Sequence, residues 1–264
     1  MTHDPSTQPP VPYHLGFGPQ HLGDEPPDVA VISGDPGRAE KIATDYLESS
    51  RPLSENRGLN AYLGFLPSGR PILSATSGMG APSLSIVINE LVQVGIKTVI
   101  RIGTCGSIQD HVRSGTVVVT SGALCRQGAA LDIAPEGYPA SADPFVTVEL
   151  ARAAADLGIA HHVGLTASVD TFFEGQERTA SSANPHLIRS RVGMVDEYRN
   201  LNILNFEMEC GTLFVMANVY GFSAGCVCAV VADRSEKEAP DLEAKAVAVD
   251  GAIRTALRAA EAFV

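Results

Sequence analysis

The chain has 264 residues, of which 45% are hydrophobic and 19% are charged, and it contains no tryptophan. A chain of this length can bury a substantial core, and its interior holds no Ser/Gly-rich or Pro-rich linker, so we expect a single domain over residues 1–264 that starts with an extended arm at 1–20. The formal net charge of −11 argues against a protein that covers nucleic-acid phosphates with a basic face, although it permits a local basic site for a small anion.

Export and membrane insertion find no support in the sequence. The N-terminal segment MTHDPSTQPPVPYHLG lacks a basic start followed by an apolar run, and the apolar stretch at 226–232 is far too short to span a bilayer. The cysteines form neither a CxxC pair nor a Cys/His cluster, so we expect free thiols in a reducing cytoplasm and no structural metal. They are Cys105, Cys125, Cys210, Cys226 and Cys228.

Short β-rich runs alternate with helical patterns from residue 29 onward. After the first of these runs, Asp35 suits a helix N-cap and Pro36 suits the first helical turn. The expected strands cover residues 29–32, 71–75, 98–102, 116–120, 163–168 and 226–232.

Helical periodicity fills the intervals between these strands. The segment PSLSIVINELVQVG, between the second and third strands, predicts a helix that ends at Gly95 and has an apolar stripe at Leu84, Ile88 and Leu91. The remaining helical patterns cover 145–157, 207–220 and a C-terminal stripe of Leu242, Ala246, Val249, Ile253 and Leu257.

The expected strands lack strict alternation of apolar and polar residues, which indicates a sheet with both faces covered by helices. We therefore expect a three-layer α/β fold. In such folds ligands collect at the loops that follow the carboxyl ends of strands. Four loops carry residues suited to that role.

The first loop, SGDPGR at 33–38, offers a site for phosphate. Gly34 and the second glycine allow backbone N–H groups to face a ligand, and Arg38 adds a planar, charged fork. The motif is neither a P-loop nor GxGxxG, and an ordinary strand-to-helix turn with a surface arginine explains it equally well.

The second loop, RIGTCGS at 101–107, begins with an arginine inside an apolar strand. A guanidinium at Arg101 needs an anionic or hydrogen-bonding partner, which is either a bound anion or an internal salt bridge with Asp or Glu. Thr104 adds a hydroxyl group nearby, and Gly106 permits the close approach of a flat ligand.

The third loop, NFEMEC at 205–210, carries two carboxylates. Glu207 and Glu209 flank Met208 at the start of an apolar helical stretch. Carboxylates are good acceptors for the two hydroxyl groups of a ribose. Acids at a helix N-terminus are also favoured by the helix dipole alone, so both interpretations stay open.

The fourth loop, DTFFEGQER at 170–178, combines aromatic and polar side chains. Phe172 and Phe173 suit the walls of a nucleobase pocket. Gln176 and Arg178 suit the edge of uracil, which shows two carbonyl acceptors around one N–H donor. The alternative is an aromatic-anchored loop with a solvated polar tip.

Taken together and in this order, these loops resemble the nucleoside phosphorylase-I family, and in particular its uridine-cleaving members. The similarity also includes YHLGFG at 13–18, the GAALDIAP stretch and VVADRSEKEAP, so it covers nearly the whole chain. It implies an α/β/α sandwich with a central mixed β-sheet, assembled as dimers within a hexamer, with sites near the subunit interfaces.

The resemblance also implies roles for individual residues. The phosphate ligands would be Gly34, Arg38, Arg57, Arg101 and Thr104, with Arg57 supplied by a neighbouring subunit. The ribose contacts would be Met208 and Glu209, with Glu207 beside them and His14 donated by the neighbour near the 5′-hydroxyl. The uracil pocket would consist of Gly106, Phe172, Gln176, Arg178 and Phe206.

The implied reaction is reversible phosphorolysis, in which uridine and phosphate give uracil and ribose 1-phosphate in nucleoside salvage. Phosphate held by arginines, Arg101 among them, attacks C1′, while Gln176 and Arg178 stabilise the charge that builds on the uracil oxygens. The partners implied are the nucleoside and phosphate, with no metal, redox cofactor, nucleic acid or membrane.

Two positions depart from the family pattern. Gly58 stands where some bacterial relatives carry a Glu that helps bind a monovalent cation, so we expect no such ion site although Ser83 is retained. Asp233 stands where uridine-cleaving members generally have Asn, and purine-specific relatives use an Asp there as general acid. Asp233 is therefore a further candidate catalytic residue.

Alternatives remain open. A purine or broad-specificity nucleoside phosphorylase would use Asp233 as its acid. A non-catalytic nucleoside-binding or storage protein would not need Arg38, Arg57 and Arg101. The charged segment at 234–241 is either a solvated loop or a lid over the base pocket.

Overall fold

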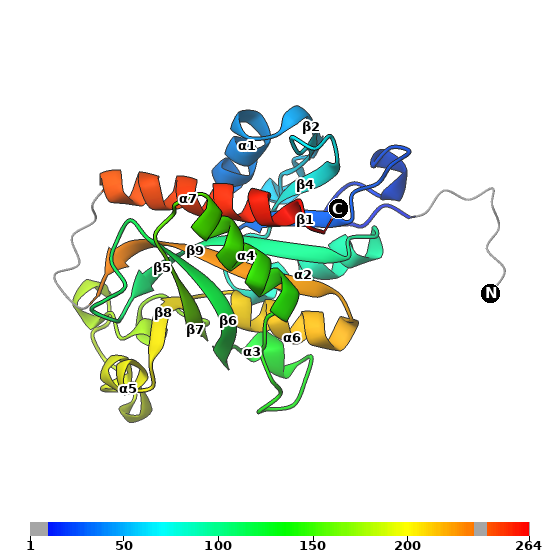
Figure 1. Cartoon of the computed structure of the whole chain (residues 1–264). Helices are drawn as coiled ribbons and strands as arrows, with labels where there is room; N and C mark the ends of the chain where they lie inside the picture. The colour runs from blue at the N-terminus through cyan, green and yellow to red at the C-terminus, as the bar shows by residue number, and fades with distance from the viewer. Residues whose placement is uncertain (1–9, 235–241, 264) are drawn as a thin grey trace.

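The computed structural model describes residues 10–234 and 242–263 of the chain (Figure 1). Residues 1–9 of the expected arm lie outside this range, and Arg234 is the one residue of the proposed lid that lies within it. A search of the described residues finds no helix with both the length and the apolar composition of a membrane span.

The described residues contain a nine-stranded sheet with the order β2-β3-β4-β1-β5-β8-β7-β6-β9. Strand β1 pairs in parallel with β4 and β5, whereas β3 pairs antiparallel with β2 and β4, so the sheet is mixed as expected. The strands are β1 (Val29–Ser33), β2 (Glu48–Ser54), β3 (Ala61–Phe65), β4 (Pro71–Thr76), β5 (Thr98–Ser107), β6 (Val117–Arg126), β7 (His161–Val169), β8 (Ile203–Glu207) and β9 (Ser223–Asp233).

Five of these strands close into a ring. Strand β9 pairs in parallel along all of β5 and antiparallel with β6, and the circle is completed by β7 and β8. In this ring Gly106 pairs with Phe206, Ser107 with Asp233, and Ser168 with Glu207. The carboxyl ends of β5, β7, β8 and β9 therefore meet at one place.

Helices cover both faces of the sheet. Ala30 and Ile32 of β1 belong to a core cluster shared with α2 and α6, whereas Val29 and Val31 belong to another shared with α4 and α7. Figure 1 shows α4 and α7 crossing the sheet next to each other. The helices are α1 (Pro36–Asp45), α2 (Ala81–Gln93), α3 (Gly128–Leu131), α4 (Pro144–Asp156), α5 (Met194–Asn200), α6 (Cys210–Tyr220) and α7 (Leu242–Ala260).

The local sequence signals of α1 and α2 are confirmed. The Asp35 carboxylate caps α1 by accepting a hydrogen bond from the backbone N–H of Gly37 at 2.9 Å. On α2 the expected stripe of Leu84, Ile88 and Leu91 is completely buried. Both helices therefore begin and face as their sequences predict.

Two expectations were wrong in detail. The helix expected at 207–220 begins only at Cys210, because the residues up to Glu207 pair with β5 and β7 as strand β8. On α7, Ala246 is exposed rather than part of the buried stripe, and small residues such as Ala248 and Ala252 face the core instead. Their size lets α7 lie close to the sheet.

Candidate active site

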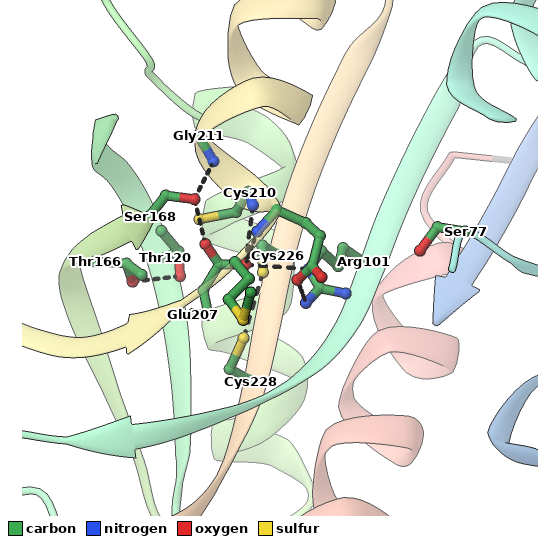
Figure 2. A network of polar contacts seen from close by, with 12 residues as sticks. Ser77, Arg101, Thr120, Thr166, Ser168, Glu207, Cys210, Gly211, Cys226 and Cys228 are labelled. Carbon is green, nitrogen blue, oxygen red and sulfur yellow. Dashed lines mark hydrogen bonds and ion pairs between the residues drawn. The ribbon is translucent and has the colours of Figure 1, made fainter. Parts of the chain in front are cut away.

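Arg101 lies on β5, is 4% exposed, and is bound by two acids at the end of the neighbouring strand β8 and just after it (Figure 2). Its Nε donates to Oε2 of Glu207 over 3.2 Å, and its Nη2 donates to Oε2 of Glu209. Burial lowers the pKa of a guanidinium, but the charges of Glu209 and Glu207 outweigh it and hold the pKa of Arg101 above its usual value. The internal salt bridge considered from the sequence is therefore present. Burial also raises the pKa of Glu209, although the charge of Arg101 opposes the rise.

The remaining terminal nitrogen of Arg101 is available to a ligand. This Nη1 is buried and has no hydrogen-bond partner among the described residues, a situation that costs about 1–3 kcal/mol for a buried polar group. Arg38 lies nearby, because its Nη1 donates to the backbone carbonyl of Ile102 over 3.1 Å. Burial lowers the pKa of Arg38, and the charge of Arg101 adds to this. Two guanidinium groups therefore lie close together, and that of Arg101 has an unpartnered N–H donor. This arrangement suits a bound anion.

The glycine loop lies beside these arginines. Strands β1 and β5 are parallel neighbours with Ile32 opposite Arg101, so the residues that follow each strand share one edge of the sheet. A Cβ on Gly34 would lie 3.1 Å from the carbonyl oxygen of Gly78, so the loops after β1 and β4 are in close contact at this point. The expected phosphate residues of the glycine loop and β5 are thus brought together, with Thr104 half-buried on β5.

Glu207 holds the start of α6, whereas Glu209 binds the residue that precedes α2. The Oε2 of Glu207 accepts hydrogen bonds from the backbone N–H groups of Glu209 and Cys210, both at 2.9 Å. Its Oε1 accepts from the Ser168 hydroxyl at 2.5 Å, and Oε1 of Glu209 accepts from the Gly80 N–H at 2.6 Å. The helix N-terminal interpretation is therefore correct for Glu207, and Met208 between the two acids is half-buried.

Sequence reasoning missed Ser168 and Gly80 as partners of the two glutamates. A signal was available, because Ser168 ends an expected strand and Gly80 stands in the loop after another, which is where polar groups converge in this class of fold.

A possible metal grouping lies in the same network. Donor atoms of Glu207, Cys210 and Cys226 lie within 4.8 Å of one another. The Glu207 carboxylate is already occupied by hydrogen bonds from Arg101, Ser168 and the backbone, and Figure 2 shows the thiols packed beside it. All five cysteines are free thiols, as expected. The grouping is explained by packing and hydrogen bonding, and the expectation of no metal stays a prediction.

The residues expected to bind uracil form one cluster. Arg178 donates from Nε to Oε1 of Gln176 over 3.1 Å, and its guanidinium lies 4.4 Å from the centre of the Phe172 ring. A Cβ on Gly106 would lie 3.1 Å from Nη2 of Arg178, and Gly106 pairs with Phe206 across β5 and β8. The stacking on Phe172 and the hydrogen bond to Gln176 hold the guanidinium in one orientation.

Two further polar side chains lie at the end of β9, and Arg234 adjoins this cluster. The guanidinium of Arg234 lies 5.4 Å from the centre of the Phe206 ring, and its Cδ would lie 3.1 Å from a Cβ on Gly106. Asp233 instead accepts a hydrogen bond from Nη1 of Arg113 over 3.0 Å. No sequence pattern indicated a role for Arg113, and Arg234 was expected only as part of the charged segment at 234–241.

His14 and Arg57 stand apart from these groups and next to each other. The His14 ring lies 2.6 Å from Oε1 of Glu90 on α2, and Asn56 donates from Nδ2 to the His14 carbonyl over 3.0 Å. Arg57 follows Asn56 directly, is exposed and has a φ of 57°. Within the described residues no hydrogen bond or ion pair joins either residue to Arg101.

Comparison with known proteins places this geometry in a family. The model of the phosphorylase superfamily matches residues 28–264. The chain belongs to the phosphorylase superfamily. It is 37% identical over 248 residues to a uridine phosphorylase of Escherichia coli (strain K12), which covers 94% of this chain and 96% of that protein.

Relatives named for different activities share this similarity. A uridine phosphorylase of Thermococcus kodakarensis is 37% identical over 241 residues, or 87% of this chain and 85% of that protein. A guanosine phosphorylase of Halorubrum lacusprofundi is 32% identical over 203 residues, or 77% of each chain. Superfamily membership alone therefore leaves the base to be decided by the site.

Proposed function

We propose that this member of the superfamily is a uridine phosphorylase, a pentosyltransferase that converts uridine and phosphate reversibly into uracil and ribose 1-phosphate. The observation that carries the proposal is the meeting of two different groups around β5. One is the Arg38–Arg101 pair with its orphaned donor, and the other is the Gln176–Arg178 pair stacked on Phe172. The uridine phosphorylases of similar sequence support the same conclusion.

The arginine pair acts on phosphate in this proposal. Arg38 and Arg101 hold the anion under C1′ of the ribose, with Gly34 and Thr104 beside it. Glu207 and Glu209 keep the Arg101 guanidinium in one orientation, so little reorganisation is needed when phosphate binds. A phosphate oxygen then forms the bond to C1′ as the bond from C1′ to N1 of uracil breaks.

The base pocket stabilises the leaving group. As the glycosidic bond lengthens, the electron pair passes to uracil and the ribose becomes cationic. Donors already aimed at the carbonyl oxygens stabilise this charge more in the transition state than in the ground state. Arg178 supplies guanidinium donors and Gln176 an amide, while Phe172 and Phe206 flank the base and Gly106 leaves room for it.

The ribose is assigned to the start of α6. Met208 and Glu209 contact the sugar in this proposal, and Glu209 divides its carboxylate between Arg101 and the Gly80 N–H. Glu207 acts through Arg101 and the backbone, because its oxygens are already taken up by those partners.

A second copy of the chain completes the site. His14 and Arg57 lie on one surface, linked through Asn56, and this surface adjoins a cavity of about 490 Å³ lined in part by Ile86 and Tyr220. We assign these two residues to the neighbouring subunit's phosphate and ribose 5′-hydroxyl, within dimers that assemble into a hexamer.

The remaining expectations form part of the same proposal. We infer a three-layer α/β/α sandwich, and the core clusters on both faces of β1 support it. A cytoplasmic location is favoured by the free thiols. Phosphate is the co-substrate without a further cofactor, and Gly58 replaces the ligand of a monovalent cation.

The decisive experiment measures uracil release from uridine with and without phosphate. Phosphate-dependent release of uracil together with ribose 1-phosphate is the expected result. Tight uridine binding without release at any phosphate concentration would identify a storage protein, and release without phosphate would identify a hydrolase.

A further inference from the structure

Asp233 is the last residue of β9 and pairs with Ser107, the neighbour of Gly106 in the base cluster. Its neighbour Arg234 packs against Phe206, whereas its own carboxylate is bound by Arg113 over 3.0 Å. The Asp233 side chain is 16% exposed and that of Arg113 is 51% exposed. Arg113 comes from the loop between β5 and β6, where its carbonyl accepts a hydrogen bond from the Thr116 hydroxyl at 2.7 Å.

The two classes of nucleoside make different demands on such an acid. Uracil leaves as an anion spread over two carbonyl oxygens, which hydrogen-bond donors such as Gln176 and Arg178 stabilise. A purine leaves with negative charge on its imidazole ring, and a proton delivered to a ring nitrogen assists its departure. A carboxyl group at the base edge therefore matters for purines, and only when it carries a proton.

Acid catalysis by Asp233 would require a proton on its carboxyl group and an orientation toward the base. The ion pair with Arg113 opposes both requirements. A guanidinium at hydrogen-bond distance favours the carboxylate over the protonated acid. The same contact also directs one oxygen of Asp233 toward the loop after β5. The sequence thus provides a carboxyl group at Asp233 that could act as a general acid, and the tertiary structure pairs it with the guanidinium of Arg113.

We propose that Arg113 is a specificity-determining residue, which holds Asp233 as an ion-paired carboxylate and so withholds an acid from bound purines. Arg113 acts through Asp233 and is a positioning residue. The inference rests on the proposed phosphorolysis and adds to it the reason for a preference for pyrimidine nucleosides.

The test compares Arg113→Gln with the unaltered enzyme on two substrates. Phosphate-dependent release of hypoxanthine from inosine and of uracil from uridine are measured as kcat and KM. The inosine-to-uridine ratio of kcat/KM should rise by roughly tenfold or more, chiefly through kcat for inosine, because a general acid contributes at least that much. The uridine reaction should change little, since Arg113 is half-exposed and has no assigned contact with substrate.

Matched variants separate this role from a structural one. The double variant Arg113→Gln/Asp233→Asn should return the ratio to that of the unaltered enzyme, because the released acid is gone. Arg113→Lys should preserve the original ratio by retaining the cation. Arg152→Gln is the control, because it breaks a different ion pair, with Glu149 on α4, that also contains an exposed arginine. It should leave the ratio unchanged.

Three results would overturn the inference. They are an unchanged ratio in Arg113→Gln, a parallel loss of activity on both substrates, and rapid inosine cleavage by the unaltered enzyme that Asp233→Asn abolishes. Failure of the proposed function is a separate result. In that case the unaltered enzyme would either not cleave uridine or cleave it without phosphate.

Discussion

The Nε atom of Arg101 lies 3.2 Å from Oε2 of Glu207, and both side chains are almost completely buried. A cation of β5 and an anion at the end of β8 thus neutralise each other beneath the candidate phosphate site. With Glu209 also bound to Arg101, the two acids balance the charges of Arg101 and Arg38. In the proposed site, phosphate would therefore be bound by directed N–H donors rather than by excess positive charge, and an Arg57 donated by a second subunit would add the missing charge.

Replacing Arg38 should weaken phosphate binding. In Arg38→Gln we expect the KM for phosphate to rise by roughly tenfold or more, because a charge-assisted donor is lost, while the KM for uridine changes less. Steady-state kinetics at varied phosphate concentration measures both. Lys41→Gln on the same helix removes an exposed charge that pairs with Asp45 and serves as the control. Equal effects of the two substitutions would contradict the assignment of Arg38 to phosphate.

Adding one methyl group at Gly106 should disturb the base pocket. The new Cβ of Gly106→Ala would lie 3.1 Å from both Nη2 of Arg178 and Cδ of Arg234, so at least one of these arginines must move. We expect kcat/KM for uridine to fall by roughly tenfold, because the required shift is smaller than the misplacement of about 1 Å that costs roughly a hundredfold. Gly128→Ala meets its nearest atom at an ordinary 3.7 Å and should keep its activity. Full activity of Gly106→Ala would remove Arg178 from the site.

Mixed oligomers should show whether subunits share sites. Arg57→Ala and Gln176→Ala should each be nearly inactive, because one lacks a donated phosphate ligand and the other lacks a base contact. When the two variants are mixed and reassembled, some sites receive an intact Arg57 beside an intact Gln176, and part of the activity should return. Activity that stays at the level of the separate variants would show that each chain uses its own Arg57.

The contact between the arm and α2 should make stability depend on pH. Burial raises the pKa of a carboxyl, but the hydrogen bonds from the His14 ring and the backbone of Leu15 and His14 lower the pKa of Glu90 below its usual 4.5. A lowered pKa in the folded state stabilises the fold above about pH 4.5, and this contribution is lost as the pH falls through the lower folded value.

Substituting Glu90 tests this linkage. At pH 7 we expect Glu90→Gln to lower the free energy of unfolding by about 1.5–3 kcal/mol, the usual contribution of hydrogen bonds to a charged group. Urea denaturation should show this deficit narrowing below pH 4.5, whereas Glu149→Gln, from an exposed pair on α4, should differ little from the unaltered protein at either pH. A deficit that is the same at pH 7 and pH 4 would mean that the Glu90 charge is not its cause.

The amino-acid sequence by itself determined the features that depend on neighbouring residues. The Asp35 cap, the α2 stripe of Leu84 and Ile88, and the position of the polar loops after apolar strands are local patterns, and the structure contains them. Strand β2 was missed because Arg51 and Pro52 are exposed and give no alternating pattern. The sequence also left each candidate side chain with two interpretations.

Only the tertiary structure revealed the internal partners of Arg101 and Asp233, because the members of each pair are far apart in the chain. Arg101 meets Glu207 across 106 positions, and Arg113 meets Asp233 across 120. Neither pair has a periodicity or a cap that links its members. They meet because β5 pairs with both β8 and β9, which brings the carboxyl ends of those strands together in the closed ring. The residue types thus follow from the sequence, and the charge that each one faces follows from the fold.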